Sequence, residues 1–139
     1  MTIRDVINNA TALGACGKTA HINNWQELAH LFFTPQGLEF CQKNNFPSID
    51  ICRAIKTDIL SHNVFVDCGN INIENQKNVC VAGNTYATIK CSENSFVHKI
   101  IMMHGAKAKI YASNYAVIRI VKLGEGDVDI QKDNTVVIL

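Results

Sequence analysis

The sequence predicts an α+β protein in which a short helical head, residues 1–62, precedes an all-β body of repeats, residues 63–139. Apolar residues recur at helical spacing up to Ile59, whereas from Val64 onward they alternate with polar residues or form β-branched runs. The two parts have a similar charge balance, so we expect them to form one structural unit. The repeats are marked by four asparagines that lie 19, 20 and 20 residues apart: Asn75, Asn94, Asn114 and Asn134.

The composition is that of an ordinary globular domain. Hydrophobic residues make up 47% of the 139 residues and charged residues 18%, which excludes a disordered chain. A net charge of +1 provides no overall attraction to nucleic acid or to a membrane. We expect no secretory signal, because Asp5 and two asparagines interrupt the first apolar residues. We also expect no membrane span, because no apolar segment approaches the roughly 20 residues that a spanning helix needs. These features predict a cytoplasmic protein with six reduced cysteines.

Three or four short helices are predicted in the head, each from a residue that caps its first turn. Asp5 follows Thr2 and Glu27 follows Asn24 at the three-residue spacing of a capping box. Thr34 before Pro35 and Ser48 after a proline indicate two further starts. Five aromatic residues in this short region favour a small core over a pocket or a partner surface: Trp25, Phe32, Phe33, Phe40 and Phe46.

Aligning the four asparagines predicts which side chains stack in the body. Residues of equal position should form ladders, with alternate side chains pointing inward. One inward ladder would contain Val79, His98, Ile118 and Ile138, in which His98 is the discordant member. The residues between the inward ladders, Cys80, Lys99 and Arg119, should stack on each other and face solvent.

Asparagine suits a corner that is repeated once per coil, because it tolerates the left-handed backbone and bonds neighbouring backbone groups. With this spacing and these corners, the body from Val64 to Leu139 resembles β-solenoid proteins of the parallel β-helix type. The resemblance concerns architecture alone and implies a stack of coils. The glycines at the turns are less regularly spaced, which leaves an antiparallel β-sandwich as the alternative fold.

A run of basic residues is the main candidate binding surface. No acidic residue lies between Glu93 and Glu125, and stacked coils would bring Lys99 and Arg119 within about 5 Å of each other. We expect this surface to take a protein or anionic partner, with nucleic acid the less favoured class. The acidic cluster after Glu125 could instead neutralise it. The candidate residues are Lys99, Arg119, Lys107, Lys109, Lys122, His98 and His104.

The last coil is the second candidate interface. Its apolar strand would present unpaired backbone groups and a hydrophobic cross-section, which favours pairing with a second copy of the chain. A homo-oligomer is therefore expected, through Val136, Val137, Ile138 and Leu139.

Motifs for catalysis, metals and cofactors are missing from the sequence, which has no nucleophile elbow, no paired carboxylates and no zinc spacing. We therefore predict a non-enzymatic binding or adaptor protein that uses a β face or its helical head and self-associates. No metal and no cofactor are expected. The alternative is a small-ligand or nucleotide-binding protein, or a degenerate hydrolase, with its pocket where head and body meet.

Overall fold

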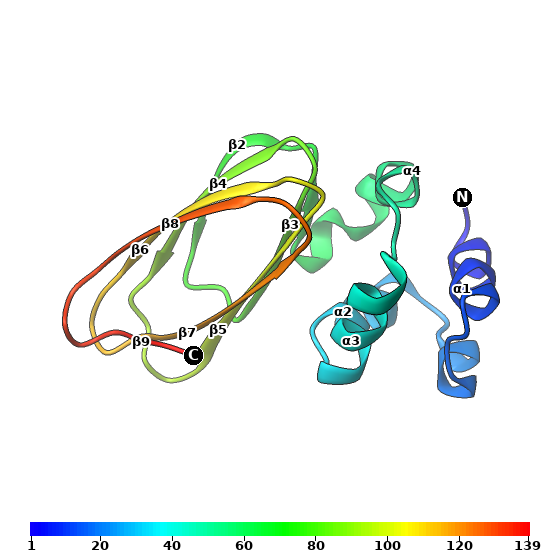
Figure 1. The fold of residues 1–139 in the computed structure, drawn as a ribbon, viewed down its shortest axis with the longest axis horizontal. Coiled ribbons are helices and arrows are strands. Elements are labelled where there is room, and N and C mark those ends of the chain that lie inside the picture. The colour runs from blue at the N-terminus through cyan, green and yellow to red at the C-terminus, as the bar shows by residue number, and fades with distance from the viewer. The chain divides into compact units, whose positions relative to one another are not determined.

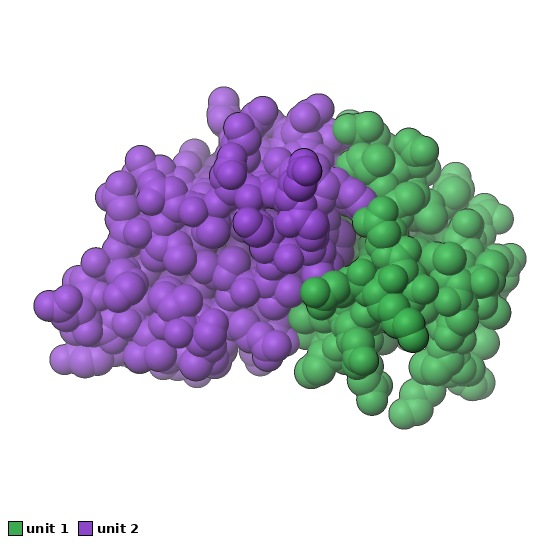
Figure 2. Space-filling view, viewed as in Figure 1, with its two compact units in different colours: residues 1–64 green, residues 65–139 purple.

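The structure is a computed structural model that describes all 139 residues and divides into two compact units, Met1–Val64 and Phe65–Leu139 (Figure 2). The first unit contains the helices, and the second contains nearly all of the strands (Figure 1). The α+β prediction, with a helical segment before a β-repeat body, is confirmed. The helical elements are α1 (Ile3–Ala12), η1 (Gly17–His21), α2 (Trp25–Phe32), α3 (Pro35–Asn44), α4 (Ile49–Ile59) and η2 (Leu60–His62).

Each of the four α-helices begins at the capping residue that the sequence predicts. The Thr2 hydroxyl accepts a hydrogen bond from the Asp5 N–H, and the Asp5 carboxylate accepts one from the Thr2 N–H. Asn24 and Thr34 accept in the same way from the N–H groups of Glu27 and Gly37, and Ser48 caps α4. Local chemistry therefore determines where these helices start.

The second unit is a β-solenoid of roughly four turns. Its strands are β1 (Val64–Val66), β2 (Gly69–Glu74), β3 (Asn78–Ala82), β4 (Thr85–Cys91), β5 (Val97–Met103), β6 (Lys107–Ala112), β7 (Val117–Leu123), β8 (Asp127–Lys132) and β9 (Val137–Ile138).

Odd-numbered and even-numbered strands form the two walls of the solenoid (Figure 1). Sheet A has the strand order β1-β3-β5-β7-β9, and sheet B has the order β2-β4-β6-β8. From β2 to β9, neighbouring strands within each sheet pair in parallel, as β2 with β4 and β5 with β7 do. An antiparallel sandwich would require hairpin pairing between consecutive strands, so the structure does not favour that alternative.

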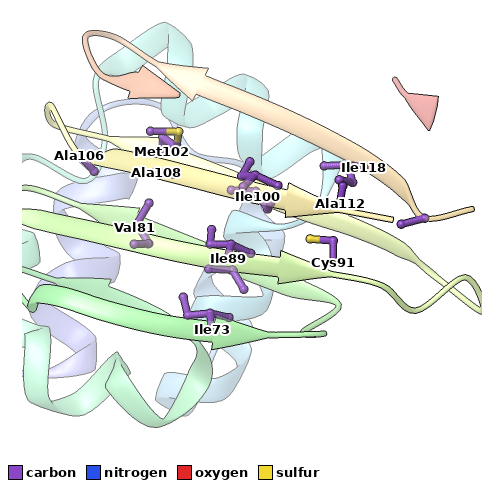
Figure 3. Packing of buried hydrophobic residues seen from close by; sticks show 14 of the residues in the cluster. Ile73, Val81, Ile89, Cys91, Ile100, Met102, Ala106, Ala108, Ala112 and Ile118 are labelled. Carbon is purple, nitrogen blue, oxygen red and sulfur yellow. The ribbon is translucent and has the colours of Figure 1, made fainter. Parts of the chain in front are cut away.

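The solenoid core lies between the two sheets, where inward side chains stack in columns (Figure 3). One column on sheet B consists of isoleucine alone and runs through Ile73, Ile89, Ile110 and Ile130, which are register partners in successive strands. Alanines occupy the neighbouring inward positions of β4 and β6, so the flattened coils leave room for the isoleucines.

The predicted stacking is confirmed for the later coils and wrong for the first. Lys99 pairs with Arg119 as predicted, and His98 pairs with Ile118. In the first coil, however, Val79 pairs with Ile100, and Asn78 takes the place beside Lys99 that was predicted for Cys80. The prediction that Cys80 faces solvent is also wrong, because its side chain is fully buried.

Unequal turns explain the error. Asn75–Lys77 joins β2 to β3 with three residues, whereas the turn between β4 and β5, residues 92–96, contains five. The offset between paired residues therefore changes from 16 (Gly69 with Thr85) to 21 (Asn78 with Lys99). Because the resulting slip in the predicted register is two residues, inward positions remain inward.

The asparagine corners are only partly as expected. Asn75 and Asn114 adopt the left-handed conformation, with φ of 50° and 57°, whereas Asn94 and Asn134 do not. The Asn75 Oδ1 accepts a hydrogen bond from the N–H of Ser92 in the next coil, at 2.8 Å. Asn114 donates back to the Ser92 carbonyl, at 3.0 Å. The corners thus join successive coils, but through serine rather than through a continuous asparagine ladder.

Candidate functional site

The outward face of sheet B is entirely polar. β2, β4, β6 and β8 alternate between inward apolar and outward polar residues, so each strand contributes three exposed side chains to this face. Three lysines and three acidic residues among them cancel in charge. The outward residues are Asn70, Asn72, Glu74, Tyr86, Thr88, Lys90, Lys107, Lys109, Tyr111, Asp127, Asp129 and Gln131.

A groove of about 830 Å³ lies on this face, and we call it the sheet B groove. Because its lining includes outward residues of all four strands, it crosses every coil and runs along the solenoid axis. The outward residues that line it are Asn72, Glu74, Thr88, Lys90, Tyr111 and Gln131. At the turn side its border includes Ser113, Lys132 and Asp133.

The charged groups in the sheet B groove balance each other. Lys90 Nζ lies 3.7 Å from the Glu74 carboxylate on the neighbouring strand. Hydrogen bonds from the hydroxyl and the N–H of Thr135 hold the pKa of Asp133 below its usual range. Together with Lys132, these residues give two positive and two negative charges, so the groove has no net charge at neutral pH.

Tyr111 is the only aromatic residue in the lining of the sheet B groove, and it is 40% exposed. The Lys109 ammonium lies 5.5 Å from the centre of its ring, and the hydrogen bond between the two side chains raises the pKa of Lys109. Tyr86 has a similar environment on the same face, with Lys107 at 5.7 Å and an exposure of 46%, but it does not line the groove.

The predicted basic surface is divided between the two sheets. Lys99 and Arg119 stack on sheet A, where burial, together with the charges of Arg119 and Lys77, lowers the pKa of Lys99. Lys107 and Lys109 lie on sheet B beside their register partners, Asp127 and Asp129. The acidic residues of the next coil thus adjoin two of the seven residues of the predicted surface.

The other three candidate residues of that surface have local roles. Lys122 occupies an inward register position in the last coil and donates to the Gly126 carbonyl at 3.1 Å. His104 lies in the turn between β5 and β6, with φ of 54°. His98 is fully buried, as its place in the inward ladder predicts, and its Nε2 lies 2.8 Å from the Glu93 carbonyl oxygen.

The residues predicted to form an oligomer interface differ in exposure. Val136 is buried and belongs to the core cluster of the solenoid. Val137, Ile138 and Leu139 are 51%, 36% and 66% exposed. β9, which contains two of them, is the outermost strand of sheet A.

A cavity of about 540 Å³ lies within the helical unit. Phe32, Phe40 and Phe46 contribute to its wall, so part of the predicted aromatic core borders open space. Cys16 also lines this cavity and is exposed. A hydrogen bond from the Lys18 N–H lowers the pKa of the Cys16 thiol, and the Thr19 hydroxyl and the Lys18 charge act in the same direction.

We expect Cys16 to be the first cysteine alkylated by iodoacetamide. Its lowered pKa increases the thiolate fraction at neutral pH, and the thiolate is the reactive form. Burial raises the pKa of Cys41 to about 12 and that of Cys91 to about 11, so both remain protonated. Peptide mass spectrometry over pH 6–9 should show modification of Cys16 before the others, and Cys16→Ser should abolish the fast phase. Equal rates at Cys16 and Cys41 would contradict this.

The structure contains no helix long and apolar enough to span a membrane, and no group of three or more His, Cys, Asp or Glu side chains placed to hold a metal ion. No family model, no curated protein and no solved structure matches this chain.

Sequence reasoning missed the sheet B groove and both tyrosines. A signal for them was present: inward pairs recur as Ile71-x-Ile73, Ala87-x-Ile89, Ala108-x-Ile110 and Val128-x-Ile130. The polar face is formed by the residue between the two members of each pair and by the residues that flank the pair. The asparagine alignment instead followed the corners and the strands of sheet A.

Proposed function

We propose that this protein is a non-enzymatic binding protein whose binding site is the sheet B groove. The supporting observation is that one groove crosses all four strands of sheet B and that the charged side chains in its lining balance each other. Such a groove offers a ligand a row of hydrogen-bonding groups at each coil, about 4.8 Å apart. This arrangement suits an extended polymer better than a compact ligand.

The scaffold also supports a binding role. Side chains on a parallel sheet with a packed core on its inner side are held by a rigid backbone, so the groove is largely preformed. Ile73 is part of the lining, and Ile89 and Ile110 are its register partners in the next strands of sheet B; all three are buried. A preformed site loses little conformational entropy when a polymer binds.

Retention of polymers tests the proposal. The immobilised protein is exposed to arrays of neutral glycans, anionic glycans, RNA and peptides. We expect at least one class to be retained by the wild-type protein and to be lost in Thr88→Lys, which fills the groove with a long charged side chain. Asn70→Lys places the same side chain on the same face outside the groove and should retain binding. Failure of the wild-type protein to retain any class would refute the proposal, as would equal effects of the two variants.

The exposed apolar side chains at β9 support self-association as a second property. Two copies that pair through this edge would cover Val137, Ile138 and Leu139. We expect sedimentation velocity to show a dimer that forms with rising concentration, and Val137→Lys to shift it to monomer. Leu13→Lys alters a residue of similar exposure in the helical unit and should leave the dimer intact. A wild-type protein that remains monomeric throughout would contradict this.

Small-ligand binding within the helical unit is a second candidate function. It is favoured by the cavity of about 540 Å³, a size within the usual range of ligand pockets. Since Cys16 lines this cavity, a compound bound there should slow its alkylation. A library of small aromatic compounds that leaves the alkylation rate of Cys16 unchanged would count against this function.

A further inference from the structure

We infer that the ligand of the sheet B groove is a neutral, linear polysaccharide that lies along the solenoid axis, with about one sugar unit per coil. The inference rests on the proposed function of the groove and specifies its ligand. Three features of the groove support this choice of ligand: its repeat, its charge and its single aromatic ring.

The repeat of the groove determines the orientation and the spacing of the ligand. Parallel strands bring equivalent positions together at about 4.8 Å, and one six-membered sugar ring with its glycosidic oxygen extends about as far. A chain along the axis would therefore meet Glu74, Lys90, Tyr111 and Gln131 in turn, since these are register partners on successive strands. An extended peptide repeats at about 3.3 Å per residue and would lose this match after one or two coils.

The charge of the groove selects a neutral ligand. Glu74 is close to Lys90, and Asp133 is stabilised as a carboxylate next to Lys132 in sequence, so neither sign predominates. Nucleic acids and acidic glycans bind through an excess of lysine and arginine, which this groove lacks. Hydroxyl groups both donate and accept hydrogen bonds, so they suit a lining that mixes carboxylate, amide, ammonium and hydroxyl groups.

The exposed ring of Tyr111 provides the apolar contact. The C–H groups of a pyranose ring form an apolar face that packs on an aromatic ring, while the hydroxyls at its edge bond to neighbouring polar groups. Thr88 and Asn72 lie on the groove beside the column that contains Tyr111, where their side chains can serve as such neighbours. Tyr111 is therefore expected to contribute the largest share of binding.

Calorimetric titration with β-1,4-linked gluco-oligosaccharides of two to six units tests the inference. Affinity should rise with length up to about four units, the number of strands that the groove crosses, and then level off. Tyr111→Ala should weaken binding of the longest oligosaccharide about tenfold or more. Tyr86→Ala removes a tyrosine of similar exposure outside the groove and should change affinity less than about twofold.

The outcomes separate the ligand class from the site. Retention of RNA, an acidic glycan or a peptide, without binding of any neutral glycan in the array, would overturn the polysaccharide and leave the groove as the binding site. Neutral glycans of another linkage that bind with the same dependence on length and on Tyr111 would support the inference. Equal losses in Tyr111→Ala and Tyr86→Ala, with both variants folded by circular dichroism, would overturn the placement along the groove.

Discussion

Gly37→Ala is expected to destabilise the helical unit by about 3 kcal/mol or more, the largest effect of any single methyl group that we predict in this protein. A Cβ atom at this position would lie 1.7 Å from the Leu31 carbonyl oxygen and 2.9 Å from the Thr34 hydroxyl. The first of these is a backbone atom at the end of α2, so α2 and α3 would have to separate. The same movement would break the cap that Thr34 provides to α3.

The expected loss of stability is opposite in sign to the change that helix propensity alone would give. Alanine in a helix is normally more stable than glycine by about 1 kcal/mol, so without the clash the substitution would stabilise α3. Trp25, the only tryptophan, lies in α2 and reports unfolding of this unit by fluorescence in urea. Gly17→Ala is the control, because no atom lies within 4 Å of its added Cβ. A Gly37→Ala variant as stable as the wild type would contradict the packing of α2 on α3.

Ile110→Ala is expected to reduce the free energy of unfolding of the solenoid by about 3 kcal/mol. Ile110 is fully buried, and it stacks between Ile89 and Ile130. Truncation leaves a cavity that its rigid neighbours on both sides can fill only in part.

Ile138→Ala makes the same chemical change at a side chain that is 36% exposed, so it should reduce stability by less than about 1 kcal/mol. Urea unfolding followed by far-ultraviolet circular dichroism measures both variants. If the two substitutions have equal effects, the inward column on sheet B does not form the centre of the core.

The helix starts could be predicted because their causes are local. Thr2, Asn24, Thr34 and Ser48 each bond an N–H group three residues further along the chain, so a short window of sequence contains the whole interaction. The change to a β body was equally visible, because side-chain alternation follows directly from strand geometry.

The register of the first coil could not be predicted from the asparagine spacing. Asn75 bonds to Ser92 rather than to Asn94, because the turn after β4 is longer than the turn after β2. The length of a turn depends on contacts between coils, which a repeat count does not include. Turn lengths were thus the missing information.

The candidate site was harder to predict than the fold. Lys99 and Lys107 are close in sequence, but the turn after β5 carries the chain from sheet A to sheet B and separates them. Conversely, Glu74 and Gln131 are far apart in sequence and line one groove. A site of this kind exists only after the coils are in register.

The similar sequence offsets between paired strands have a consequence for the kinetics of folding. Partners in the ladders are 16 to 21 residues apart in sequence, so every coil closes a loop of similar length before it gains its contacts. The entropic difference between closing 16 and 21 residues is only about 0.2 kcal/mol. The entropy of loop closure therefore does not favour any one coil as the folding nucleus. Each completed coil then provides a template for the next. We therefore expect the solenoid to fold by adding one coil after another, with a low contact order despite its β structure.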